Sequence, residues 1–239
     1  MDIKQSQRIQ TSVLNGIEKK ALVWLAQRQP QWVTSDHLTL VGFVGALMVA
    51  AGFALSNLSV GWLWLSSLGM VVNWYGDSLD GTLARVRNTQ RPIYGYYVDH
   101  TIDCVNEGLM FIGVGLSPFV HLDLALIAYA LYLIMTINVS INAHLKGEFK
   151  LTYAKLGPTE FRLVVIIMNT ILIAFEDIRN WSFALPIGST AYSMHLLDCV
   201  AVVVIVVLML MLLFTFVKDA KGYAKIDPKK KPGTGGAKS

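Results

Sequence analysis

The sequence predicts an all-α integral membrane protein, a bundle of six transmembrane helices with an N-terminal amphipathic surface helix. Of the 239 residues, 54% are hydrophobic and only 15% are charged, whereas a soluble domain carries about a quarter charged residues. The apolar residues form long runs that are separated by short charged connections. In hydrocarbon only a helix satisfies the hydrogen bonds of its own backbone, because an open strand leaves its edges unpaired.

Six segments provide the roughly 20 mostly apolar residues that a spanning helix needs. We expect the spans at 37–57, 60–84, 95–116, 121–144, 159–176 and 191–217. The chain then divides into three parts. These are a cytosolic N-terminal segment (1–36), a six-helix transmembrane domain (37–217) and a basic, disordered cytosolic tail (218–239).

Before the first span, residues 12–29 carry apolar side chains at helical spacing with lysines on the opposite side. This pattern is typical of a helix that lies on the membrane surface. An ordinary amphipathic helix packed on the cytosolic face of the bundle explains the pattern equally well.

The basic residues predict the orientation. The chain has 20 Lys and Arg residues, and in the six-span arrangement all except Arg179 fall on the side of the membrane that holds both termini. The positive-inside rule therefore predicts that both termini are cytoplasmic. In a bacterium the protein would lie in the inner, or cell, membrane.

Four aspartates interrupt this apolar pattern. Asp77 and Asp80 lie near the cytosolic end of the second span, and Asp99 and Asp103 lie near the start of the third. Their spacings, i,i+3 and i,i+4, place each pair on one helix face. Two neighbouring helices thus offer two carboxylates each at a similar depth.

Converging carboxylates in a low-dielectric region must take up protons or bind cations. Ligand sets made only of oxygen favour Mg²⁺, Mn²⁺ or Ca²⁺, and four carboxylates suit a two-metal site of the kind used in phosphoryl transfer. Small residues and Arg85 nearby fit a phosphate-bearing ligand. The alternative is that the aspartates are merely solvated at the headgroup level, which explains one such residue better than two pairs in register.

The stretch from Asp77 to Asp103 resembles the signature of the CDP-alcohol phosphotransferases, D-x2-D-G-x2-A-R-x8-G-x3-D-x3-D. Every fixed residue type is present, although nine residues rather than eight separate Arg85 from Gly95. The additional residue falls in the expected loop between the two spans, where insertions are tolerated.

The resemblance implies transfer of a substituted phosphate from a CDP-linked alcohol to an acceptor alcohol, with release of CMP. It implies that Mg²⁺ or Mn²⁺ is held by Asp77, Asp80, Asp99 and Asp103, with Asp103 also acting as the base. It further implies a homodimer. The distribution of basic residues places the site on the cytoplasmic side, and no nucleic-acid partner is expected. The residues that the resemblance assigns to the CDP site are Gly81, Ala84, Arg85 and Gly95.

Further polar residues are candidates for the second substrate or for orienting the metal ligands. For each, a structural alternative remains open: a hydrogen bond to a neighbouring helix, or, for the arginine, an anchor at the membrane interface. These candidates are Asn73, Glu107, Asn138, Asn142, Glu160 and Arg162. Four residues on the opposite side are excluded from the site: Glu176, Asp177, Arg179 and Asp198.

The leading prediction is a phospholipid-synthesis enzyme that uses CDP-diacylglycerol, with membrane lipids and a small acceptor alcohol as partners. The "DHTID" stretch also fits an enzyme that transfers a headgroup from CDP-choline or CDP-ethanolamine to diacylglycerol. A hypothesis of another class is a cation or proton transporter, for which acidic residues distributed through the bilayer would be expected.

Overall fold

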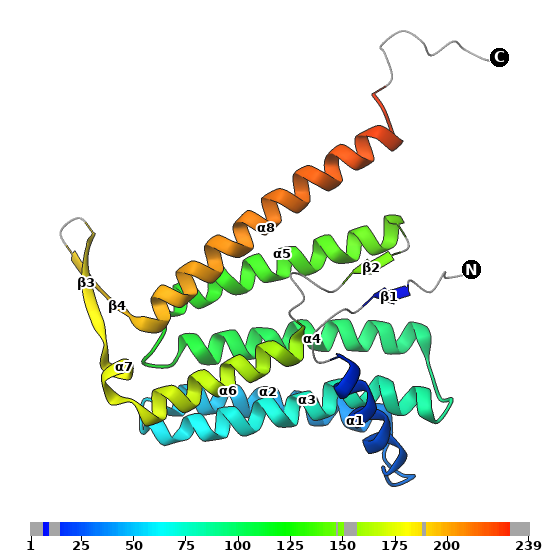
Figure 1. The fold of residues 1–239 in the computed structure, drawn as a ribbon, viewed down its shortest axis with the longest axis horizontal. Coiled ribbons are helices and arrows are strands. Elements are labelled where there is room, and N and C mark those ends of the chain that lie inside the picture. Colours follow the sequence, from blue (N-terminus) through cyan, green and yellow to red (C-terminus); the bar gives the residue numbers. More distant parts are fainter. Residues whose placement is uncertain (1–6, 10–14, 147, 151–156, 188–189, 230–239) are drawn as a thin grey trace.

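The computed structural model describes residues 7–9, 15–146, 148–150, 157–187 and 190–229. Helices make up most of this part of the chain, which confirms the predicted helical class (Figure 1). The helices are α1 (Asn15–Gln27), α2 (Ser35–Leu55), the short 3₁₀ turn η1 (Val60–Trp62), α3 (Leu63–Val86), α4 (Pro92–Gly115), α5 (Leu122–Lys146), α6 (Pro158–Ala174), α7 (Glu176–Asn180) and α8 (Leu196–Ile226). The strands are β1 (Gln7–Ile9), β2 (Glu148–Lys150), β3 (Ser182–Ile187) and β4 (Thr190–His195).

Each expected span corresponds to one long helix. Among the described residues, α2, α5 and α8 are long and apolar enough to cross a membrane by length and composition alone. Helix α6 has only 17 residues, and α3 and α4 carry the aspartates. The integral membrane class is therefore clear from the apolar helices, while the number of spans remains a prediction.

The helix starts follow local rules. At the start of α2 the Thr34 hydroxyl accepts a hydrogen bond from the His37 amide at 3.3 Å, and the His37 ring accepts one from the Thr34 amide at 3.2 Å. Helices α4 and α6 begin with Pro92 and Pro158, which suit a first helical turn because they lack an amide hydrogen. Helix α4 thus starts earlier than the expected residue 95. In the turn before it, Asn88 adopts a left-handed φ of 56°.

Helix α2 packs against both α3 and α4. Glycines allow the backbones of α2 and α3 to touch: a Cβ atom at Gly45 would overlap the backbone of Asn73, and one at Gly76 would overlap that of Gly42. This close approach of small residues is a common means of packing helices in membranes. It determines how near α2 comes to the aspartates on α3.

Helix α1 lies across the end of the bundle that holds the aspartates. Its Leu22 and Ala26 are buried with Leu79 and Leu83 of α3. The Glu18 carboxylate accepts hydrogen bonds from Trp74 of α3 at 2.8 Å and from Thr159 of α6 at 2.6 Å. The helix is thus packed on the bundle, and a role at the membrane surface remains a prediction.

Helices α5 and α8 lie side by side and α8 carries apolar side chains around most of its circumference (Figure 1). Val203, Leu210 and Phe214 are among its most exposed residues. An apolar surface of this length suits lipid rather than water.

The sixth span differs most from its predicted boundaries. Residues 191–195, expected to begin the sixth span, belong to the antiparallel hairpin β3–β4, and the helix starts at Leu196. At the other end α8 continues to Ile226, beyond the expected end of the span at residue 217, whereas residues 230–239 of the predicted tail lie outside the described part of the chain. A second, parallel pairing joins β1 to β2 and was not predicted. Hydropathy alone does not separate an apolar strand from the first turns of an apolar helix.

Candidate functional site

The aspartates of α3 and α4 converge, as their spacing predicts. Asp77, Asp99 and Asp103 each place a carboxylate oxygen within 4.8 Å of the others. All three side chains are half-buried. Three carboxylates at this separation repel one another strongly unless a cation or protons lie between them.

Asp80 belongs to the same cavity but is held by neighbouring groups. The Thr39 hydroxyl of α2 donates to Asp80 Oδ2 at 2.7 Å, and the Gly81 amide donates to Asp80 Oδ1 at 2.5 Å. The Ser35 hydroxyl donates to the Asp80 carbonyl at 2.9 Å, which ties the start of α2 to this turn of α3. These contacts fix the orientation of the carboxylate. The sequence did not single out Thr39, because nothing in a linear pattern places α2 beside Asp80.

Arg162 reaches the aspartates from α6. Its guanidinium lies 2.5 Å from Asp77 Oδ2 and donates two hydrogen bonds to Asn73 Oδ1, at 3.1 and 2.8 Å. Asn73 is buried, and its amide nitrogen donates to the Gly42 carbonyl of α2 at 2.9 Å. Of the additional candidates, Arg162 thus contacts the metal-ligand candidate Asp77, and Asn73 holds the guanidinium of Arg162 in place.

Asn106 is a residue of this cavity that the sequence analysis missed. It lies on α4, lines the cavity together with the four aspartates, and is 5% exposed. Its Oδ1 is one of two buried side-chain polar atoms without a hydrogen-bond partner among the described residues, the other being Asn138 Nδ2. A signal was present in the sequence, because Asn106 follows Asp99 and Asp103 at i+7 and i+3 and so shares their helix face.

The residues expected to line the CDP site lie nearer to the α3–α4 connection. A Cβ atom at Gly81 would meet only Arg85, at 3.3 Å, and one at Gly95 would meet nothing within 4 Å. Both glycines therefore leave their helix backbone open to a ligand. Arg85 is exposed and donates to the Thr82 hydroxyl at 2.9 Å, and Ala84 is half-buried on the same helix.

The other candidates have different surroundings. Asn142 donates to Asn138 Oδ1 at 3.0 Å and to Asp219 of α8 at 2.7 Å, and it accepts from Tyr223 at 2.6 Å. These hydrogen bonds agree with the interhelical alternative. Glu160 accepts from the Gly157 amide at 3.0 Å and so caps α6.

The remaining predicted residues lie beyond Asp103 on α4 or at the other end of the bundle. Glu107 is half-buried one turn beyond Asp103 on α4. The excluded residues Glu176, Asp177 and Arg179 belong to α7, and Asp198 lies in the first turn of α8. In Figure 1 these elements are at the end of the bundle opposite to the α3–α4 connection.

The donor set fits a divalent cation. Asp77, Asp80, Asp99 and Asp103 bring four carboxylates to one cavity, and Arg162 balances part of their charge through its ion pair with Asp77. The unpartnered Oδ1 of Asn106 adds a neutral oxygen. Hard oxygen ligands of this kind are those that Mg²⁺ and Mn²⁺ prefer.

Comparison with known proteins agrees with this site. Residues 32–192 match the family described as CDP-alcohol phosphatidyltransferase. The chain is similar to archaetidylinositol phosphate synthase of Methanothermobacter thermautotrophicus, with 33% identity over 39% of this chain and 45% of that protein. It is also similar to phosphatidylinositol phosphate synthase of Cutibacterium acnes, with 35% identity over 35% of this chain and 38% of that protein.

A third relative is matched over more of the chain. Cholinephosphotransferase 1 of Danio rerio is 24% identical over 69% of this chain and 44% of that protein. In all three comparisons the match spans less than half the length of the relative. The family match covers most of the chain and includes all four aspartates, and it gives no support to the transporter alternative. The chain is a member of the CDP-alcohol phosphatidyltransferase family.

Proposed function

We propose that the protein transfers a substituted phosphate group from a CDP-linked alcohol, CDP-diacylglycerol in the first instance, to an acceptor alcohol and releases CMP. The observation that supports this most is the convergence of the Asp77, Asp99 and Asp103 carboxylates within 4.8 Å of one another. Family membership supplies the reaction class. The acceptor hydroxyl oxygen forms the new bond to the β-phosphorus, and the phosphoanhydride bond to CMP breaks.

Each aspartate has a role in this proposal. Asp77, Asp80 and Asp99 would hold Mg²⁺ or Mn²⁺, with Asp103 sharing in the binding, and such a metal would supply positive charge opposite the diphosphate and the CMP leaving group. Asp103 accepts the proton of the acceptor hydroxyl. Thr39 keeps the Asp80 carboxylate in one orientation through its 2.7 Å hydrogen bond, as groups behind metal ligands commonly do.

The phosphates of the nucleotide lie against the open helix backbones at Gly81 and Gly95, beside Ala84 and Arg85. The space around the two glycines supports this placement. A Cβ atom at Gly81 would meet only the flexible guanidinium of Arg85, and one at Gly95 would meet nothing within 4 Å. Arg162 is assigned to the acceptor, whose phosphate or headgroup would compete with Asp77 for the guanidinium. Such competition would release Asp77 for the metal.

The acceptor is a small polar alcohol such as inositol phosphate, glycerol phosphate, inositol or serine. Two relatives are named as synthases of inositol phosphate lipids, which favours an inositol phosphate acceptor. The cholinephosphotransferase match favours the second candidate, in which CDP-choline or CDP-ethanolamine donates to diacylglycerol. That match is longer on this chain but lower in identity.

In the membrane, helices α2, α3, α4, α5, α6 and α8 are the six spans of this proposal, with the aspartates and both termini on the cytoplasmic side. The distribution of Lys and Arg supports this orientation, and dimerisation remains an expectation from the family.

The assay that tests this function measures CMP. Full-length protein in detergent or nanodiscs is given Mg²⁺ or Mn²⁺, labelled CDP-diacylglycerol or CDP-choline, and a panel of acceptors. We expect CMP release and a new labelled phosphodiester with one donor–acceptor class, loss of both with excess EDTA, and recovery when Mg²⁺ or Mn²⁺ is returned. Folded protein that releases no CMP with any pair, or releases it equally in EDTA, would contradict the proposal.

Replacement of Asn106 by Ala is expected to weaken Mn²⁺ binding by about tenfold or more, within the range for groups that support metal sites. The reason is the loss of the unpartnered Oδ1 that lines the aspartate cavity. Electron paramagnetic resonance of free Mn²⁺ measures the affinity without relying on turnover. Asn138→Ala removes the other unpartnered buried group, a donor on α5, and should retain the wild-type affinity. Equal affinities for the two variants would remove Asn106 from the site.

A further inference from the structure

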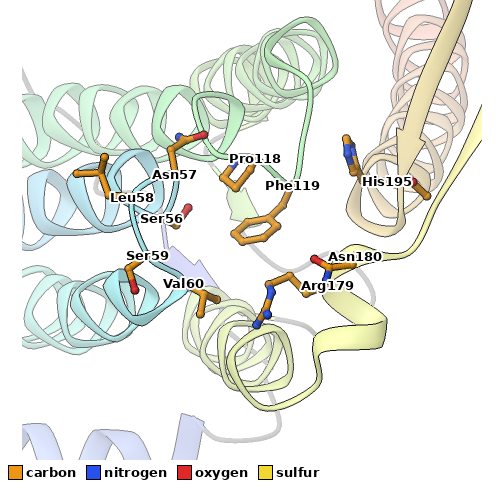
Figure 2. A pocket seen from close by; sticks show the side chains of 11 residues that line it. Ser56, Asn57, Leu58, Ser59, Val60, Pro118, Phe119, Arg179, Asn180 and His195 are labelled. Atoms are coloured by element: carbon orange, nitrogen blue, oxygen red, sulfur yellow. The ribbon is translucent and has the colours of Figure 1, made fainter.

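A second cavity lies at the end of the bundle opposite to the aspartates. It is open to one side and has a volume of about 440 Å³ between the α2–α3 connection, the α4–α5 connection, α7 and the hairpin (Figure 2). Cavities that bind small molecules commonly have volumes of roughly 300–1,000 Å³. Phe119 gives it one apolar wall, and Ser59, Arg179, Ser182 and His195 bring polar groups to it from four separate segments.

Arg179 supplies the positive charge of this cavity. Its side chain is only 20% exposed, and one guanidinium nitrogen donates to the Leu172 carbonyl at the end of α6, at 3.1 Å. Its acidic neighbour Glu176 lies 3.5 Å away and is 75% exposed, so solvent weakens this ion pair. The guanidinium is therefore held in place while further N–H donors are available to a ligand.

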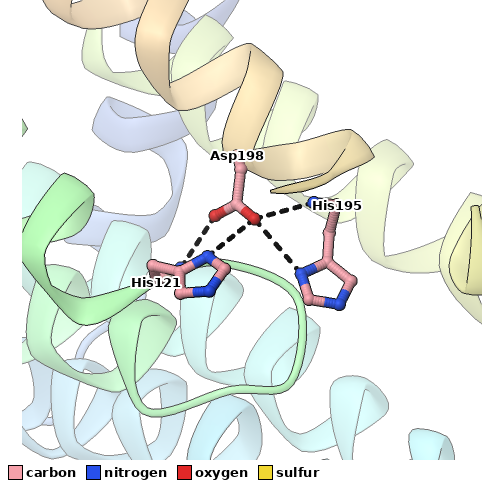
Figure 3. A group of neighbouring side chains, drawn as sticks. All are labelled: His121, His195 and Asp198. Atoms are coloured by element: carbon pink, nitrogen blue, oxygen red, sulfur yellow. Dashed lines mark hydrogen bonds and ion pairs between the residues drawn. The ribbon is translucent and has the colours of Figure 1, made fainter. Parts of the chain in front are cut away.

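His195 is held in one orientation by Asp198. The Asp198 carboxylate is fully buried, lies 2.8 Å from the Nδ1 of His121 and 3.2 Å from the Nδ1 of His195, and accepts the amide hydrogens of both residues at 2.8 Å (Figure 3). A carboxylate accepts, so the hydrogen of the His195 ring lies on Nδ1. The Nε2 atom of the neutral ring is then an acceptor, which suits a hydroxyl group of a ligand in the cavity.

The histidine pair and Asp198 are also close enough together to hold a metal ion. The contacts just described, however, already engage both Nδ1 atoms and both carboxylate oxygens. They account for the cluster as a group that orients the two rings and joins β4 and α8 to the α4–α5 connection. The cavity, rather than the cluster, is therefore the candidate site for a ligand.

We propose that this cavity binds a small phosphate-bearing anion that also carries a hydroxyl group. Arg179 is its charge partner, the hydroxyls of Ser59 and Ser182 donate to the phosphate oxygens, and Nε2 of His195 accepts from the hydroxyl of the ligand. Ser59 Oγ accepts from the Gly61 amide at 3.3 Å, so its own hydrogen points away from that group. The phosphate belongs either to a lipid headgroup or to a soluble anion. Inorganic phosphate and a phosphatidylglycerol headgroup both present anionic phosphoryl oxygens to Arg179 and a hydroxyl to His195. The site is separate from the aspartates and does not depend on the proposed reaction.

Two binding measurements distinguish the sources. In one, inorganic phosphate is titrated calorimetrically into the full-length protein in detergent, with EDTA present to keep metal from the aspartates. In the other, native mass spectrometry detects lipid retained from nanodiscs of phosphatidylcholine with a minor share of phosphatidylglycerol. Binding of phosphate in the first measurement indicates a soluble anion, and retention of phosphatidylglycerol in the second indicates a lipid headgroup. Either result supports the site if the variants described next weaken or abolish that binding.

Arg179→Gln is expected to lower the affinity about 10- to 100-fold, the effect of losing a charge-assisted hydrogen bond. Ser182→Trp is expected to abolish binding by filling the cavity, whereas Ser193→Trp, on the neighbouring strand and outside the cavity lining, should bind as wild type. Thermal unfolding without ligand checks the fold, and Arg179→Lys, which keeps the charge, should retain part of the affinity. The proposal is overturned if wild type binds neither probe, or if Arg179→Gln and Ser182→Trp bind like Ser193→Trp.

Discussion

Asp103→Asn is expected to lower the rate of CMP release by about 10²- to 10⁴-fold, the usual contribution of a positioned general base. The substituted amide cannot accept the proton of the acceptor hydroxyl, and it is a weaker metal ligand than a carboxylate. The measurement is the initial rate of CMP release with saturating donor and acceptor in the presence of Mg²⁺.

The stability of the same variant separates a chemical role from a structural one. Carboxylate oxygens of Asp77, Asp99 and Asp103 lie within 4.8 Å of one another, so removing one charge reduces the repulsion between these carboxylates in metal-free protein. Asp103→Asn should therefore unfold at the same or a higher temperature than wild type in EDTA. Asp177→Asn, an exposed aspartate on α7, should leave both rate and stability unchanged. An inactive variant that is also clearly less stable in EDTA would indicate a structural role for Asp103.

Gly76→Ala is expected to destabilise the protein by roughly 1–3 kcal/mol, the usual cost of overpacking, or to prevent folding. A Cβ atom there would overlap the backbone of Gly42 and the Leu38 carbonyl, and neither can move without separating α2 from α3. Separation would also draw Thr39 away from Asp80, so the surviving folded protein should have reduced activity. Thermal unfolding and size-exclusion chromatography in detergent measure the effect.

The matched control is Gly222→Ala on α8. A Cβ atom at Gly222 would meet nothing within 4 Å, and alanine is the better helix former by about 0.5–1 kcal/mol. The two identical chemical changes should thus have opposite signs. If both variants unfold at the wild-type temperature, the α2–α3 contact is looser than described.

Much of the fold followed from local patterns. The length of each apolar run predicted where the long helices lie, because the bilayer thickness and the helical rise together require it. Reliance on apolar runs also explains why the β3–β4 hairpin was missed, since the apolar residues of β4 resemble the start of the helix that follows. The continuation of α8 to Ile226 was missed because charged residues signalled the end of a span, whereas a helix can continue into water.

The aspartate pairs on α3 and α4 were determined by the sequence alone, since spacings of three and four residues put side chains on one helix face whatever the surroundings. The partners of those aspartates were decided only by the tertiary structure. Arg162 meets Asp77, and Thr39 meets Asp80, across more than 40 positions of sequence because glycines let α2 and α3 touch and α6 packs beside them. Helix periodicity describes one helix at a time, whereas these contacts depend on the distance between helices.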